Sequence, residues 1–153
     1  MDTSRVQLAL NVNDIDEANA FYGKLFDATP HKRRVEYANF TISNPSLKLV
    51  LIENPSATTS LGHLGVEVAD TEDVRHAADR FMLEQMPTVT EQGVDCGFAV
   101  QDKVSVTSPE GEQWEVYTML DDDGKVGASS GTATTSGCCT TAETKEAVSS
   151  ACC

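Results

Sequence analysis

The sequence has few basic side chains and no long apolar run. Its 153 residues carry 11 Lys and Arg against 24 Asp and Glu, which gives a formal net charge of −13. An acidic surface repels phosphate groups, so neither a nucleic acid nor an anionic membrane is an expected partner. No apolar stretch approaches the roughly 20 residues that a membrane-spanning helix needs. The N-terminal residues lack the basic and then apolar layout of a secretion signal, so we expect a cytoplasmic protein.

The five cysteines do not have the arrangement of a secreted, disulfide-rich protein. Cys96 stands alone, whereas Cys138 and Cys139 are neighbours in the chain, as are Cys152 and Cys153. Neighbouring cysteines form only a strained local disulfide, which favours reduced thiols in a reducing compartment. Paired thiols suit soft, thiophilic ions.

The C-terminal part differs in composition from the rest of the chain. Of the 30 residues from 124 to 153, 20 are Gly, Ala, Ser or Thr, and the last aromatic residue is Tyr117. Such a segment buries too little apolar area to offset the entropy that it would lose on ordering. We therefore expect one folded domain over residues 1–120 and a disordered, cysteine-containing tail over residues 121–153.

An internal repeat organises the folded part. Residues 7–14 and 63–70 align at an offset of 56, and both alternate apolar with other side chains, which is typical of a half-buried strand. A helical pattern follows each of them, with Asp14 and Thr71 as the expected N-caps.

Further strand-like runs follow each predicted helix. They lie near residues 34–35, 37–42 and 47–52 in the first half, and near 88–91, 97–100, 104–107 and 113–119 in the second. The pattern predicts an α+β domain of two βαβββ modules, residues 5–55 and 61–120. Neither half can bury a good core alone, so we expect the modules to pack with pseudo-twofold symmetry and curled sheets to form a cleft.

Side-chain direction selects three candidate metal ligands. The apolar residues of the two repeated strands pack under the helices, so Gln7 and His63 point to the opposite face, and Glu115 lies on that face of the last strand. Imidazole and oxygen donors can hold a divalent metal such as iron, manganese, nickel or zinc. A structural histidine that only satisfies its hydrogen bonds is the alternative interpretation of His63.

Lys48 occupies the position in the first module that corresponds to Glu115 in the second. A carboxylate there would complete a closed site with four protein ligands, and a lysine cannot serve that role. The pattern therefore favours an open site with three protein ligands. Glu53 is an alternative fourth ligand, although it lies at a strand end beside Asn54 and Pro55.

The duplicated pattern carries the motifs GHLGVEV around His63 and GEQWEVYT around Glu115. With these motifs the chain resembles the vicinal oxygen chelate superfamily of glyoxalases, bleomycin-resistance proteins and extradiol dioxygenases. Within it, the chain resembles the cadmium-induced proteins and the non-haem iron carbon–arsenic lyases, through VQLALNV, YANFTI, LKLVLIENP, LGHLGVEV, FAVQDKV and WEVYT. The resemblance implies Fe(II) held by Gln7, His63 and Glu115. It also implies a trivalent organoarsenical and O₂ as substrates.

The resemblance further implies an adjacent pair of cysteines that binds As(III), just before the segment FAVQDK. Here Cys96 is present, and Gly97 stands where its partner would be. Two tethered thiolates chelate As(III) far better than one. A tail pair such as Cys138 and Cys139 is therefore a candidate source of the second thiol.

Two further residues are candidates for a role in catalysis. Lys103 precedes a strand beside the expected cleft and can place a cation near bound anionic groups or oxygen. Tyr117 shares the face of Glu115 and can line the substrate pocket. A lysine in a loop and a tyrosine packed in the core are the respective alternatives.

Three functions remain open from the sequence. The first is an Fe(II)-dependent lyase of dioxygenase type that splits the carbon–arsenic bond. The second is a non-enzymatic stress protein that sequesters Cd²⁺ or As(III), and the third is a glyoxalase-like or dioxygenase-like enzyme with another small substrate. The sequence leaves open whether the protein is a monomer or a homodimer.

The composition of residues 124–153 predicts that their removal leaves the domain as stable as before. A chain that ends at Asp123 should melt within about 2 °C of the full chain, a shift that corresponds to well under 1 kcal/mol for a domain of this size. Thermal unfolding of both chains, followed by circular dichroism, measures this. A loss of about 5 °C or more would show that the segment packs against the domain.

Overall fold

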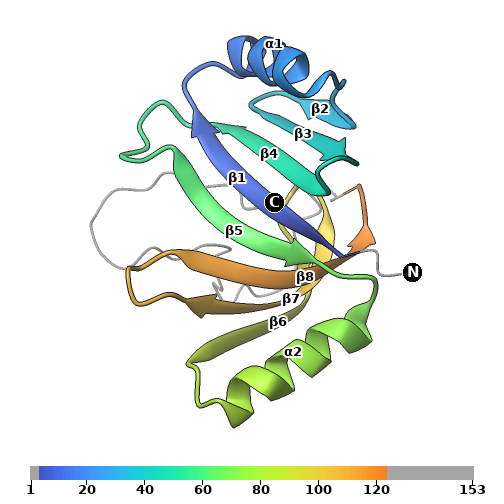
Figure 1. Cartoon of the computed structure of the whole chain (residues 1–153), viewed down its shortest axis with the longest axis vertical. Helices are drawn as coiled ribbons and strands as arrows, with labels where there is room; N and C mark the ends of the chain where they lie inside the picture. The colour runs from blue at the N-terminus through green and yellow to red at the C-terminus, as the bar shows by residue number, and fades with distance from the viewer. Residues whose placement is uncertain (1–3, 124–153) are drawn as a thin grey trace, which may run out of the picture.

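The chain folds as two successive βαβββ units (Figure 1). The structure is a computed structural model that describes residues 4–123. The first unit consists of β1 (Arg5–Val12), α1 (Ile15–Phe26), β2 (Lys32–Arg34), β3 (Tyr37–Ile42) and β4 (Leu47–Glu53). The second consists of β5 (Leu61–Glu67), α2 (Thr71–Leu83), β6 (Thr88–Asp95), β7 (Val100–Thr107) and β8 (Gln113–Asp121). The predicted duplication and α+β class are confirmed.

The eight strands form one open, mixed sheet. Their order is β2-β3-β4-β1-β5-β8-β7-β6, so the two units meet where β1 pairs antiparallel with β5. On either side of this pair, β1 pairs in parallel with β4, and β5 pairs in parallel with β8. Each unit therefore repeats the same strand order outward from the centre, which is the expected pseudo-twofold relation.

Each helix begins at an aspartate cap. The Asp14 carboxylate accepts hydrogen bonds of 2.9 Å from the backbone N–H groups two and three residues further on. The prediction of Thr71 as the second cap is wrong by one residue, because Asp70 fills that role. The Thr71 hydroxyl instead donates to Asp102 of β7 over 2.6 Å, which ties the start of α2 to the sheet. Within residues 4–123, no helix has the length and apolar character needed to cross a membrane.

Both helices pack on the same face of the sheet. Ile15 of α1 lies in an apolar cluster with Phe40 and Leu49, and Phe81 of α2 lies in a second cluster with Val104. Side chains alternate between faces along a strand, so the neighbours of these strand residues point the other way. We call that opposite side of the sheet the helix-free face.

The sheet curls around its helix-free face. Four strands separate β3 from β7, which in a flat sheet would place them roughly 24 Å apart. Tyr37 of β3 nevertheless stacks on Phe98, in the loop before β7, with ring centroids 4.1 Å apart and planes 10° from parallel. Lys32 of β2 also donates to the backbone oxygen of Phe98. The helix-free face is therefore concave, as predicted.

Two strand boundaries differ from the expected ones. The run 97–100 is not a separate strand, because residues 96–99 form a loop in which Gly97 has φ +82°, far from the extended region. At the other end, β8 continues to Asp121, and Asp122 forms an ion pair of 3.5 Å with Lys32. Ordered chain thus extends past residue 120. The remainder of the expected tail, with Cys138 and Cys139, lies outside the described residues.

The apolar layer beneath α1 predicts a large loss of stability when Phe40 is truncated. Phe40 is fully buried, so Phe40→Ala should lower the free energy of unfolding by about 3–5 kcal/mol. Phe21→Ala is the matched control, because Phe21 is 59% exposed on α1 and its truncation should change the free energy by less than about 1 kcal/mol. Urea unfolding of both variants measures the difference, and equal losses would contradict the packing described here.

Candidate metal centre

Three polar side chains are buried together on the helix-free face. Gln7 of β1, His63 of β5 and Glu115 of β8 are each at most 4% exposed. The strand register explains their proximity: Gln7 pairs with Gly65 of β5, and Gly65 pairs in turn with Glu115. The β1–β5 and β5–β8 pairings therefore bring together three donors, one from each of three adjacent strands.

Gly65 leaves the space that this arrangement needs. A Cβ atom at Gly65 would lie 3.4 Å from the Cβ of Gln7, 3.3 Å from a ring carbon of Tyr117 and 3.2 Å from the backbone oxygen of Glu115. A larger residue would therefore crowd the site from its centre.

The donor atoms converge on the imidazole of His63. Its Nε2 lies 3.1 Å from Nε2 of Gln7 and 3.7 Å from Oε2 of Glu115. Burial lowers the pKa of His63 below its ordinary value, and the field of Lys103 acts in the same direction, whereas Glu115 opposes them. The ring is therefore neutral at neutral pH and has a lone pair to offer, as a metal ligand requires.

Lys103 and Gln113 hold the carboxylate of Glu115. Lys103 is 1% exposed, and its ammonium lies 3.1 Å from Oε1 of Glu115 and 3.5 Å from Oε2 of Glu91. The side-chain amide of Gln113 also donates to Oε1 of Glu115, over 3.4 Å. These contacts engage one carboxylate oxygen and leave Oε2 turned toward His63.

Tyr117 holds the carboxamide of Gln7. Its hydroxyl donates a hydrogen bond to Oε1 of Gln7, and burial raises the pKa of Tyr117 well above its ordinary value, so that the hydroxyl stays protonated. A half-turn of the amide would direct Oε1 toward His63 and Nε2 toward the hydroxyl of Tyr117, which can accept as well as donate. Tyr117 therefore orients Gln7 in either arrangement.

The three donors fit a divalent metal. They comprise one neutral imidazole nitrogen, one carboxylate oxygen and one carboxamide oxygen, a mixed set that suits iron, manganese, nickel or zinc. Within residues 4–123 no group of three His, Cys, Asp or Glu side chains is placed to hold a metal, so a site here depends on the oxygen of Gln7. In the same part of the chain, Asn39 Oδ1 and Ser105 Oγ are buried without a hydrogen-bond partner, and Ser105 pairs with Glu115.

The other predicted candidates fall in different places. Lys103 lies within β7 and not in a loop, and Tyr117 lies within β8; both side chains are buried in the cluster. Cys96 is partly buried in the loop before β7 and packs against an apolar cluster that contains Ala9, the residue paired with His63. The carboxylate of Glu53 accepts a 2.8 Å hydrogen bond from the first backbone N–H group of α1, which removes it as a fourth ligand.

The predicted equivalence of Lys48 with Glu115 is wrong. The register pairs Ala9 with Val50 as it pairs Gly65, the repeat equivalent of Ala9, with Glu115, so Val50 is the corresponding residue. Lys48 belongs instead to a second polar group beside the three donors, which sequence reasoning missed.

Lys48 is 6% exposed, and its ammonium lies 3.9 Å from Oε2 of Glu67, which also contacts Nε of Arg5 over 2.9 Å. Gln101 of β7 is 2% exposed and reaches the same neighbourhood. The alternation of side chains along each strand could have revealed this group, because Lys48 and Gln101 point to the same face of the sheet as Gln7 and Glu115.

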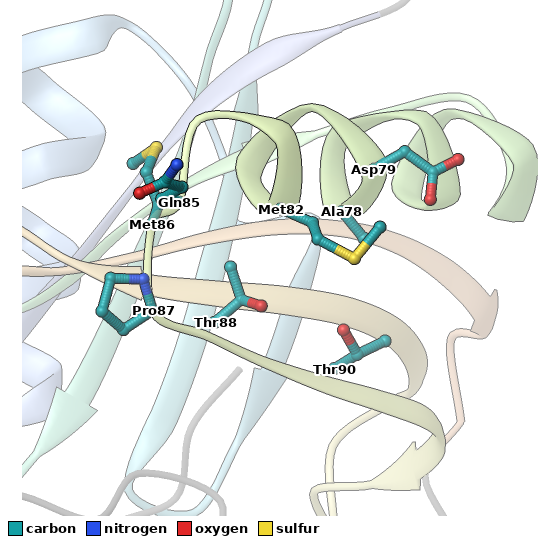
Figure 2. A pocket seen from close by; sticks show the side chains of 8 residues that line it. All are labelled: Ala78, Asp79, Met82, Gln85, Met86, Pro87, Thr88 and Thr90. Atoms are coloured by element: carbon teal, nitrogen blue, oxygen red, sulfur yellow. The ribbon is translucent and has the colours of Figure 1, made fainter.

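A groove elsewhere on the surface lacks this chemistry (Figure 2). It has a volume of about 460 Å³ and lies between the C-terminal half of α2 and β6. Asp79 is the only ionisable side chain among its lining residues, which are otherwise Ala78, Met82, Gln85, Met86, Pro87, Thr88 and Thr90. These residues contain neither an acid–base pair nor a ligand set, so the helix-free face is the better candidate site.

Comparisons with known proteins agree with the fold. The family model of the Glyoxalase/Bleomycin resistance protein/Dioxygenase superfamily matches residues 5–116. The chain is 52% identical over 125 residues to the cadmium-induced protein CadI of Mycobacterium tuberculosis, which covers 82% of each chain. It is 53% identical over 120 residues to the trivalent organoarsenical cleaving enzyme of Thermomonospora curvata, covering 78% of this chain and 80% of that protein.

Solved structures support the fold at much lower identity. The Mn(II)-bound glyoxalase from Novosphingobium aromaticivorans superposes with a TM-score of 0.57 at 17% identity, over 82% of this chain and 43% of that chain. An extradiol ring-cleaving dioxygenase from B. fuscum superposes with a TM-score of 0.56 at 18% identity, over 75% of this chain and 32% of that one.

The donor set predicts a graded loss of metal affinity in three variants. His63→Ala and Glu115→Ala should each weaken Co(II) binding by about 100-fold or more, because each removes a strong donor. Gln7→Ala should weaken it by only about tenfold, since water can replace a neutral amide oxygen. Titration with Co(II), followed by its visible absorption, measures the affinities. Stoichiometric, tight binding in His63→Ala would locate the site elsewhere.

Proposed function

The chain belongs to the Glyoxalase/Bleomycin resistance protein/Dioxygenase superfamily, and we propose that it is an Fe(II)-dependent enzyme that uses dioxygen to cleave the carbon–arsenic bond of trivalent organoarsenicals. Its relatives support a family of metal-dependent enzymes, and some of them are named for organoarsenical cleavage. The observation that carries the proposal is the convergence of Gln7, His63 and Glu115 on one point of the helix-free face.

The three donors suit a metal that must also bind small molecules. Three protein ligands leave coordination positions open, whereas four would close a tetrahedral site. Iron held by Gln7, His63 and Glu115 would supply the electrons that activate dioxygen. Two observations support this use of the site: the Glu53 carboxylate is bonded to α1, and the position equivalent to Glu115 in the first unit is Val50, which cannot bind a metal.

The surrounding residues prepare the ligands for this role. Lys103 neutralises the charge of Glu115 in a setting that excludes most water, and so stabilises the ionised carboxylate that binds metal. The Tyr117 hydroxyl fixes the orientation of Gln7. The desolvated ring of His63 stays neutral, so protons compete only weakly with the metal for Nε2.

We assign substrate capture to the loop at Cys96. In its reduced form Cys96 would offer a thiolate to As(III), and the loop packs against Ala9 and Tyr37 on the helix-free face. Because Ala9 pairs with His63, the loop lies over the same region of the sheet as the proposed ligands. Gly97 leaves the loop with one cysteine, and Cys138 and Cys139 remain the candidates for a second thiolate.

A second candidate function is the capture of a thiophilic ion without turnover. It is favoured by the 52% identity to a protein named as cadmium-induced and by the five cysteines of this chain. The two functions differ in outcome: an enzyme consumes methylarsenite in the presence of Fe(II) and air, whereas a sequestering protein binds it without loss of the carbon–arsenic bond.

Restoring an adjacent thiol should strengthen substrate capture. Gly97→Cys should tighten methylarsenite binding by about 100-fold through chelation, and Cys96→Ser should weaken it. Both affinities are measured by competition with a dithiol, and turnover is measured by release of inorganic arsenite from the Fe(II)-loaded protein in air.

Gly97→Ser is the matched control for this experiment. Gly97 has a positive φ, and a Cβ atom added there would meet open space, so serine introduces the same backbone strain as cysteine without the thiol. The serine variant should bind methylarsenite no better than the parent. If Gly97→Cys changes neither affinity nor turnover, the loop at Cys96 is not the arsenic site.

A further inference from the structure

Two buried donors beside the proposed metal ligands share one poor acceptor. The ammonium of Lys48 and the side-chain Nε2 of Gln101 each lie 3.7 Å from Sδ of Met119. Lys48 is 6% exposed and Gln101 is 2% exposed, so bulk water does not satisfy them. A thioether is a weak acceptor, and an ammonium buried against one retains most of its cost of desolvation.

Lys48 shares its nearest carboxylate with a second cation. Glu67 Oε2 lies 3.9 Å from the ammonium of Lys48 and is already paired with Arg5 over 2.9 Å. Burial lowers the pKa of Lys48, Glu67 opposes this effect, and Arg5 adds to it. A buried ammonium with so weak a counter-charge indicates a place for an incoming anion.

This position adjoins the proposed metal centre. Lys48 pairs with Gln7 across the β1–β4 ladder, and its ammonium lies 5.3 Å from the ring centroid of Tyr117. The hydroxyl of the same tyrosine holds Gln7. A small molecule bound at Gln7, His63 and Glu115 therefore has Lys48 within reach of its far end.

We propose that Lys48 and Gln101 form an anion subsite, which binds the carboxylate or a similar acidic substituent of the substrate while its other end faces the three metal ligands. An oxygen anion would replace Met119 as the acceptor of both donors, and the unbranched methionine side chain can move aside. The inference rests on the proposed function for the identity of the substrate, and within that class it predicts a preference for organoarsenicals with an acidic group.

A matched pair of ligands tests the subsite. The probes are 4-carboxyphenylarsenous acid and phenylarsenous acid, whose affinities for the full chain are measured by isothermal titration calorimetry. The parent protein should bind the carboxylated probe about tenfold more tightly. Lys48→Met should abolish that preference and leave the affinity for the neutral probe within about twofold, and Gln101→Leu should reduce the preference by about threefold.

Control variants separate loss of charge from loss of structure. Lys24→Met removes an exposed lysine of α1 and should leave the preference unchanged. Lys48→Gln removes the same charge as Lys48→Met, so it keeps the test informative if the methionine variant does not fold. Equal affinity of the parent for the two probes, or a preference that survives both Lys48 substitutions, would overturn the proposal.

An arsenic-free probe distinguishes this proposal from the proposed function. Benzoate should bind the parent protein and lose about tenfold in affinity in Lys48→Met. If benzoate behaves in this way and no arsenical is cleaved, the anion subsite stands and the carbon–arsenic lyase assignment fails. If arsenicals are cleaved but neither carboxylate depends on Lys48, the lyase assignment stands and the subsite is wrong.

Discussion

The antiparallel pairing of β1 with β5 is the contact on which the site depends. It joins the two βαβββ units into one sheet and places Gln7 of one unit beside His63 of the other. Neither unit contains the proposed ligand set alone, because Gln7 comes from the first, and His63 and Glu115 from the second. A one-residue slip of this pairing would turn Gln7 toward the helices and remove it from the site. The apolar clusters beneath α1 and α2 oppose such a slip, since it would also turn their strand residues out of the core.

The two buried lysines on the helix-free face, Lys103 and Lys48, differ in how closely carboxylates approach them. Lys103 lies within 3.5 Å of two carboxylates, Glu115 and Glu91, and so compensates the charge of a proposed ligand. Lys48 has, within the described residues, one carboxylate contact, which is 3.9 Å long. The register makes Val50, two residues further along β4, the equivalent of Glu115, so the first unit has an apolar side chain where the second has the proposed carboxylate ligand. This asymmetry is the physical basis of the proposed open metal site, with the proposed anion subsite beside it.

The duplicated architecture and the shared face of Gln7, His63 and Glu115 could be predicted from the sequence, because they follow from period-two alternation and a constant offset of 56 residues. The N-cap of α2 could not be predicted from the sequence. Asp70 and Thr71 are both good caps, and only the contact of Thr71 with Asp102 decides between them. The role of Glu53 at α1 and the curl of the sheet through Tyr37 and Phe98 depend on contacts between distant segments, which no local pattern contains. The shared contact of Lys48 and Gln101 with Met119 could not be predicted from the sequence for the same reason.

The central claim is that one metal ion binds between Gln7, His63 and Glu115. Anomalous diffraction from a crystal of the Fe(II)-loaded protein, recorded on both sides of the iron absorption edge, tests it most directly. The account predicts one strong anomalous peak in contact with all three side chains, with positions left open on the helix-free face. A peak at the cysteines, or one that contacts Lys103 and Glu91 in place of His63, would contradict it.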